Sequence, residues 1–98
     1  MAAYISIDMT PTDPEAIARY EQNVGPILAQ YGGQVIARDE TPILAEGDRK
    51  PALAVIIRFH SKDAFRAFYD SAEYKPWREF RMAHAQENAI VIEGVDAA

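Results

Sequence analysis

Four side chains that could bind a small molecule recur at helical spacing toward the end of the sequence. They are separated by three, four and three residues, which places them on one face of a helix: Tyr74, Trp77, Arg81 and His84. Such a face can hold a flat anionic molecule, because the rings stack on it and the guanidinium pairs with a carboxylate. The alternative is structural, with the two rings packed in the core and the two basic side chains reaching solvent.

Two arginines stand within otherwise apolar strand segments. Arg38 and Arg58 would each need a partner there, because an isolated buried charge is costly. Arg38 is therefore a candidate anion-binding residue in a cleft, and the alternative is a structural ion pair. Carboxylates on strands could supply that pair: Asp8, Asp39 and Glu93. Arg58 lies at the end of its strand, where an ion pair or an edge position explains it better.

Proton transfer is the other chemistry that these residue types permit, with Tyr74 and His84 as the candidate catalytic residues. The sequence has no cysteine, and its two histidines, His60 and His84, lack the H-E-x-x-H spacing of a zinc site. Neither a metal nor a cofactor is therefore expected. Ser61 and Ser71 are better explained as helix caps than as nucleophiles.

The composition favours one soluble domain that binds neither nucleic acid nor membrane. The chain has 98 residues, of which 49% are hydrophobic and 26% charged, as in ordinary globular proteins. A net charge of -5 argues against binding to a phosphate backbone. No window is apolar enough to span a bilayer, and the N-terminal residues lack the basic flank of a signal peptide. The absence of cysteine makes a cytoplasmic location the default expectation.

The first part of the sequence predicts a strand followed by a helix. Apolar residues alternate with other residues over Ala3–Met9, which is the period of a strand. Asp13 and Pro14 then match the cap and the first position of a helix with one apolar stripe. Pro26 is expected to kink this helix. Gly32-Gly33 should end it, with one glycine in the left-handed conformation and the other tolerant of substitution.

The rest of the sequence continues with the same kinds of signal. Prolines and polar residues separate the strands, and capping residues precede the helices. The expected elements are strands at Gln34–Arg38, Ala52–Phe59 and Ala89–Glu93, a helix capped by Ser61, a helical restart at Asp70–Tyr74, and a segment from Pro76 to about His84. An extension of the second strand at Ile43–Ala45, beyond Thr41-Pro42, is an alternative left open.

The resulting order, β-α-β-β-α-β, predicts an α+β ferredoxin-like fold over a single domain, residues 1–98. Right-handed crossovers place both helical segments on one face of a four-stranded antiparallel sheet. Ala52–Phe59 is apolar at nearly every position, so that strand needs cover on both faces. We expect a second copy of the chain to cover the face without helices, through Leu53–Phe59 and Ile90–Ile92. The predicted assembly is a homodimer.

A combination of short motifs resembles one known protein family. The motifs are Y-G-G at Tyr31–Gly33, then Arg38, E-G-D at Glu46–Asp48, F-Y-D-S-A-E-Y at Phe68–Tyr74, and Arg81. Together they are similar to the domain-of-unknown-function thirteen-thirty proteins, short bacterial members of the dimeric α/β-barrel superfamily, over Ala3–Val95. The chain departs from the family's usual S-P-E-Y, with Ala72 in place of the proline, and Pro76 is an addition. Arg38 falls on a family motif position, which favours its functional reading.

The resemblance implies a dimeric barrel and no assigned activity. Relatives in the wider superfamily include cofactor-free monooxygenases, lactone isomerases and haem-degrading enzymes. The favoured function is binding of a small aromatic or anionic molecule in a cleft between helices and sheet, by Arg38, Tyr74, Trp77 and Arg81. The first alternative is a cofactor-independent enzyme of the monooxygenase or isomerase type that acts on such a molecule. The second is a structural or interaction dimer without a ligand.

Overall fold

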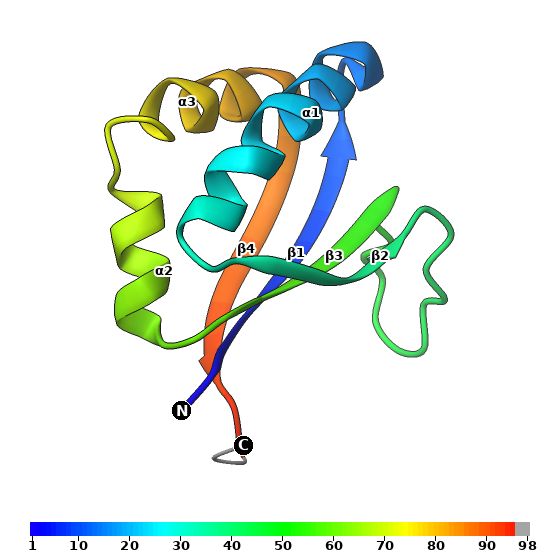
Figure 1. Cartoon of the computed structure of the whole chain (residues 1–98). Coiled ribbons are helices and arrows are strands. Elements are labelled where there is room, and N and C mark those ends of the chain that lie inside the picture. Colours follow the sequence, from blue (N-terminus) through cyan, green and yellow to red (C-terminus); the bar gives the residue numbers. More distant parts are fainter. Residues whose placement is uncertain (96–98) are drawn as a thin grey trace.

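The helices of the chain lie on one face of an antiparallel sheet (Figure 1). The computed structural model describes residues 1–95, and within them the sheet has four strands in the order β2-β3-β1-β4. The elements are β1 (Ala3–Pro11), α1 (Pro14–Gln30), β2 (Gln34–Asp39), β3 (Leu53–Phe59), α2 (Lys62–Tyr69), α3 (Lys75–His84) and β4 (Ala85–Glu93). The ferredoxin-like α+β fold is thereby confirmed, with α2 and α3 dividing the second helical segment. Residues 96–98 of the expected domain lie outside the described residues.

Strand pairing decides which apolar residues point toward the helices. Ile5 of β1 lies opposite Ile57 of β3 and Val91 of β4, and directly opposed residues share one face of a sheet. The next residue, Ser6, lies opposite Ile56 on the other face. The inner face of β1 and β3 is therefore apolar throughout, and it carries the core.

Capping residues start the first two helices where the sequence predicts them. The side chain of Asp13 accepts a hydrogen bond from the amide of Ala16 at 3.2 Å, which begins α1 with Pro14 in its first turn. The Ser61 hydroxyl accepts one from the amide of Ala64 at 3.0 Å and begins α2. Pro26 lies inside α1 without ending it. Within residues 1–95, no helix has the length and apolar character needed to cross a bilayer.

Gly32 and Gly33, which follow α1, have different structural roles. Gly32 has φ +79°, the left-handed conformation expected of a helix C-terminus, and its amide donates to the carbonyl of Ala29 at 3.0 Å. Gly33 instead allows close packing, since a Cβ there would lie 2.5 Å from Cδ1 of Leu28 and 2.9 Å from Cζ of Phe59. The expectation that the second glycine tolerates substitution is therefore wrong, because its environment is the packed core.

The segment Ile43–Ala45 is a loop and does not extend the second strand. β2 ends at Asp39, whose side chain accepts a hydrogen bond from the amide of Thr41 at 2.8 Å and turns the chain. Pro42 has no amide hydrogen to donate to a strand ladder. Residues 40–52 instead form the long connection that projects beside β2 and β3 in Figure 1.

Two boundaries in the second half differ from the sequence prediction. Asp70–Tyr74 does not restart a helix, and Ser71 does not cap α3, which begins without a side-chain cap. The Ser71 hydroxyl instead donates to the carbonyl of Phe68 at 2.7 Å and accepts from the amide of Tyr74 at 3.2 Å, which makes a turn. The last strand begins at Ala85 rather than Ala89, directly after α3. The sheet is thus longer at this end, and it reaches beneath the last turn of α3.

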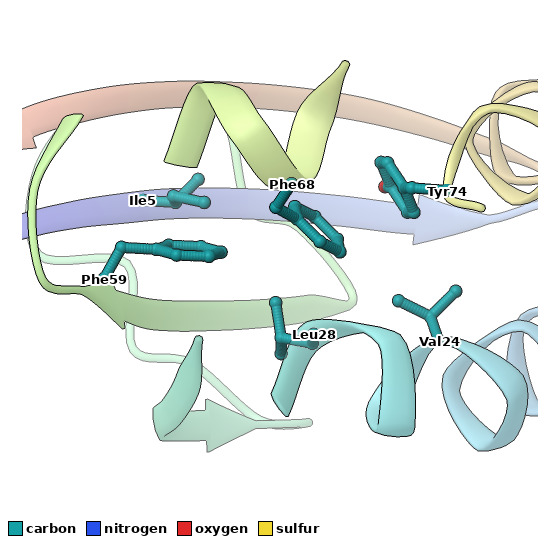
Figure 2. Close-up of a cluster of buried hydrophobic side chains, with 6 residues drawn as sticks. All are labelled: Ile5, Val24, Leu28, Phe59, Phe68 and Tyr74. Atoms are coloured by element: carbon teal, nitrogen blue, oxygen red, sulfur yellow. The ribbon is translucent and has the colours of Figure 1, made fainter. Parts of the chain in front are cut away.

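A cluster of buried side chains joins the sheet to the helices. Its members come from β1, α1, β3, α2 and the turn before α3: Ile5, Val24, Leu28, Phe59, Phe68 and Tyr74 (Figure 2). Phe59 is fully buried, and the ring centroids of Phe68 and Tyr74 are 4.2 Å apart. This packing fixes Tyr74 at the start of α3, close to α1.

The opposite face of the sheet is left without helices and carries large apolar side chains. Ile56, Ile90 and Ile92 are all exposed there, around Tyr4 and Ser6 of the central strand β1. We call Ile56, Ile90 and Ile92 the outer-face isoleucines. They correspond to part of the apolar surface that the sequence predicts for β3 and β4, whereas Leu53, Val55, Ile57 and Phe59 of β3 face the core.

Candidate functional site

A cavity of about 220 Å³ lies between the helices and the inner face of the sheet. Its floor is made by apolar residues of the strands, such as Ile7, Val55 and Val91, and its roof by residues of α1 and α2, such as Val24 and Phe65. Val35 of the edge strand β2 contributes at one side. A concave, mostly apolar space with a few polar groups is the usual form of a small-molecule site.

Two tyrosine hydroxyls meet in this cavity. Tyr20 of α1 and Tyr74 both line it, and their hydroxyl oxygens are 2.6 Å apart. Burial raises the pKa of both phenols; for Tyr74, the nearby charge of Arg81 opposes part of that rise. Both groups are therefore neutral at ordinary pH. One hydroxyl donates to the other, and the second keeps its own hydrogen for a further acceptor.

A buried ion pair lies in the same cavity. Nη1 of Arg81, near the end of α3, contacts Oε2 of Glu87 on β4. The exposed fractions of the two side chains are 7% and 12%. Glu87 lies opposite Met9 of β1, so it shares the inner face of the sheet. Nε of Arg81 and Oε1 of Glu87 are buried without a hydrogen-bond partner among the described residues.

Sequence reasoning missed Glu87 as a site residue, although a signal was present. Starting the last strand at Ala89 left Glu87 in a connection. With the strand beginning at Ala85, the alternation Ala85, Glu87, Ala89, Val91 places the carboxylate on the inner face. A single acidic residue in a row of inward-facing apolar residues is the feature that would have identified it.

Arg38 lies at the edge of the sheet and is already paired. Its Nε and Nη2 donate to the two carboxylate oxygens of Glu21 at 2.9 and 3.0 Å, and Glu40 lies at 3.7 Å. The three partners expected from the sequence, Asp8, Asp39 and Glu93, are therefore wrong, because Arg38 reaches Glu21 of α1 instead. Asp8 pairs with Arg49 at 2.8 Å, and Asp39 accepts from the amide of Thr41. Hydrogen bonding to Glu21 raises the pKa of Arg38. Arg38 is exposed, not buried.

The position of Arg38 follows from an irregularity in β2. The register with β3 shifts between Val35 and Ala37, so Ile36 is an extra residue in the ladder. Arg38 then lies opposite Val55, on the side of the sheet that faces α1. Within residues 1–95, the cavity lining includes Glu21 but not its partner Arg38.

The stripe predicted on the last helix is divided by the structure. Tyr74 and Arg81 line the cavity. Trp77 packs beside the core and against Phe80, with ring centroids 5.5 Å apart. His84 also packs against Phe80, with ring centroids 4.4 Å apart, and its Nδ1 lies 2.7 Å from the Phe80 carbonyl oxygen. The cavity lining within residues 1–95 includes neither Trp77 nor His84.

The polar groups of the cavity suit hydrogen bonding and proton transfer. Among residues 1–95, histidines and carboxylates do not gather in groups of three that could hold a metal ion. The cavity offers a pair of neutral phenols, the guanidinium of Arg81 paired with Glu87, and the carboxylate of Glu21 paired with Arg38. These groups can orient a bound molecule and exchange protons with it.

The whole described chain matches one protein family. Residues 2–95 fit the family described as Domain of unknown function (DUF1330). The chain belongs to this family. The resemblance seen in the motifs is thereby confirmed. No curated protein matches this DUF1330 chain by sequence.

Solved structures with the same fold come from several bacteria. A protein of unknown function from Rhodopseudomonas palustris is 18% identical, with a TM-score of 0.85 over 97% of this chain and 83% of that one. SnoaB, a cofactor-independent oxygenase from Streptomyces nogalater, is 14% identical, with a TM-score of 0.71 over 98% and 95%. A dimeric ferredoxin-like protein of unknown function from Thermobifida fusca is 14% identical, with a TM-score of 0.68 over 96% and 92%. At these identities the likeness concerns the fold.

Proposed function

We propose that this DUF1330 protein binds a small aromatic molecule in the cavity between its helices and sheet. The observation that supports this is the cavity itself, which has a volume of about 220 Å³ and mostly apolar walls. Its polar lining residues include Tyr20, Glu21, Tyr74, Arg81 and Glu87. An engineered apolar cavity of about 150 Å³ is enough to hold benzene. The space therefore suits one or two aromatic rings, with their polar substituent near the tyrosines.

The sequence predicts a ligand that is aromatic or anionic, and the arrangement of charges favours an aromatic ligand over an anionic one. Arg81 already faces Glu87, and Arg38 already faces Glu21. A guanidinium whose charge is matched by a carboxylate has little attraction left for a second anion. The cavity walls, in contrast, offer apolar area to a ring system.

A matched pair of substitutions on β2 tests the proposal. Val35 and Ile36 are neighbours with similar exposed fractions, 48% and 46%, but only Val35 is part of the cavity lining found within the described residues. Val35→Phe places a ring in the space that the ligand needs and should weaken binding of indole or 2-naphthol by roughly tenfold or more. Ile36→Phe should leave the affinity unchanged.

The measurement is a titration followed by ligand-observed NMR, with calorimetry on any compound that binds. A panel of one-ring and two-ring aromatic compounds, neutral and anionic, covers the classes at issue. If no compound binds to the parent protein, the proposal is wrong, and the alternative of a structural dimer without a ligand gains. Equal weakening by Val35→Phe and Ile36→Phe would place the ligand outside the cavity.

A cofactor-independent enzyme is the second candidate. The observation that favours it is the hydroxyl pair of Tyr20 and Tyr74 in the cavity, which can pass a proton to or from a bound molecule. SnoaB, which shares the fold, is described as a cofactor-independent oxygenase. Incubating each bound compound with the protein in air, followed by mass spectrometry, separates the two candidates: a binder returns the compound unchanged, and an enzyme converts it.

A further inference from the structure

The ion pair of Arg81 and Glu87 is placed where a ligand in the cavity would meet it. Both residues line the cavity, and both side chains are about nine-tenths buried, with exposed fractions of 7% and 12%. They come from α3 and β4, which adjoin in sequence, so the pair is held by two elements joined without a loop. Buried charges of this kind are costly unless their hydrogen-bonding capacity is used.

That capacity is only partly used within the protein. Nη1 of Arg81 and Oε2 of Glu87 satisfy each other, and Nε of Arg81 and Oε1 of Glu87 are buried without a partner among the described residues. The great majority of buried polar atoms in proteins have a partner. One unsatisfied donor and one unsatisfied acceptor thus belong to two side chains in the wall of a mostly apolar cavity, and both atoms are covered in the free protein.

The pair as a whole carries no net charge, which decides the kind of ligand. A carboxylate that approached Arg81 would also approach the negative charge of Glu87, and a cation would meet the reverse problem. An ether or ketone could accept from Nε and would leave Oε1 unsatisfied. A hydroxyl group can do both, since its oxygen accepts and its hydrogen donates.

We infer that the Arg81–Glu87 pair selects an uncharged ligand that carries a hydroxyl group, with a phenol or naphthol as the chemical class that also fills the apolar cavity. This inference rests on the proposed function, and it names the ligand class for the same site. Both atoms are buried in the free protein, so the two side chains shift to admit the hydroxyl. Its oxygen then accepts from Nε of Arg81, and its hydrogen is donated to Oε1 of Glu87. The rings occupy the space beside Val55 and Val91.

Four compounds with one ring system test the inference by calorimetry at pH 7. They are 2-naphthol, 2-methoxynaphthalene, 2-naphthoate and naphthalene, which differ in the polar group alone. Because hydrogen bonds to charged groups are the stronger ones, 2-naphthol should bind roughly tenfold or more tightly than 2-methoxynaphthalene. It should also bind more tightly than 2-naphthoate. Equal affinities for the naphthol and its methyl ether would overturn the inference, as would tightest binding of the naphthoate.

The outcomes separate this inference from the proposed function. If naphthalene and all three derivatives bind equally well, the cavity binds aromatic molecules and the role of the pair is wrong. If none of the four binds, both proposals fail together. The parent protein alone gives these results, so the test does not depend on any variant folding.

Two variants test whether the preference for 2-naphthol depends on the Arg81–Glu87 pair. Replacing both charges, Arg81→Met with Glu87→Met, avoids a lone buried charge, a change that proteins often tolerate. This double variant should bind 2-naphthol and 2-methoxynaphthalene equally. Glu87→Gln frees the charge of Arg81 and should shift the preference toward 2-naphthoate. Arg66→Met, which removes an exposed partner of Asp63, is the control and should keep the preference of the parent. A double variant that still prefers the naphthol would overturn the inference.

Discussion

At the scale of single residues, the chemistry of this protein depends on the partner that each polar group has inside the cavity. Tyr20 and Tyr74 share a hydrogen bond and lie away from water, which raises the pKa of both phenols. Arg81, taken from the sequence as an anion clamp, is matched by Glu87. The site therefore presents neutral or neutralised groups, and the ligand expected for it changes accordingly.

The buried tyrosines make stability depend on alkaline pH. The folded protein keeps the Tyr20 proton above pH 10, while the unfolded chain loses it near the ordinary value of 10.0. A raised pKa in the folded state means that stability is fully present below pH 10 and is lost as the pH rises beyond it. Tyr20→Phe should flatten this loss between pH 10 and pH 12, measured by urea unfolding. Tyr4→Phe, on the outer face of the sheet, is the control, and identical pH profiles for parent and Tyr20→Phe would contradict the prediction.

At the scale of elements, the end of α1 shows how one short motif meets two separate requirements. Gly32 supplies the positive φ that turns the chain, and Gly33 lets the turn lie against Leu28 and Phe59. The first requirement is local and belongs to the helix. The second arises because β3 passes beneath the turn, which joins the helix end to the core.

Three glycine substitutions separate these requirements. Gly32→Ala should destabilise the protein by about 1 kcal/mol, the cost of a Cβ in the left-handed region. Gly33→Ala should destabilise it by about 1–3 kcal/mol, since Leu28 and Phe59 must move. Gly25→Ala is the control within α1: apart from its chain neighbours, nothing lies within 4 Å of its Cβ position. Because Pro26 follows it and disfavours a Cβ on a helical residue, alanine should change the stability by less than about 1 kcal/mol. Thermal unfolding of the three variants checks the order, and a neutral Gly33→Ala would contradict the packing argument.

At the scale of the whole molecule, the sheet has one face covered by helices and one face left open. The open face carries the outer-face isoleucines, Ile56, Ile90 and Ile92. Similar structures from Thermobifida fusca and other bacteria are described as dimers. A second copy of this chain would remove these side chains from water, which makes a homodimer through this face the assembly we propose.

Two charge substitutions with matched exposure test the assembly. Ile90 on the open face and Met82 on α3 have exposed fractions of 63% and 61%. Light scattering after size exclusion should give the parent protein twice the chain mass of 10.9 kDa at micromolar concentration. Ile90→Asp should shift it to monomer, because burying an unpaired charge in an interface is costly. Met82→Asp should stay dimeric. Dissociation by Met82→Asp alone would place the interface on the helical side.

The sequence by itself determined the order of the elements and the caps of α1 and α2, because these depend on interactions between near neighbours. That order, with right-handed crossovers, was enough to predict the fold. Alternation over Ala3–Met9, the Asp13 cap and the Ser61 cap each act within a few residues and were found correctly. It also found Tyr74 and Arg81, the two members of the predicted stripe that line the cavity. Periodicity identified their face of the helix, and helical spacing is a local property.

Only the tertiary structure decided the partners of the arginines. Arg38 pairs with Glu21 because an extra residue in β2 turns its side chain toward α1. No local sequence pattern indicates this shift in the strand register. Arg81 meets Glu87 because β4 begins four residues earlier than its apolar run suggests. Within residues 1–95, Trp77 and His84 both pack against Phe80 and do not line the cavity. Pairing between distant elements depends on strand register and helix rotation, which are set by the packed core as a whole.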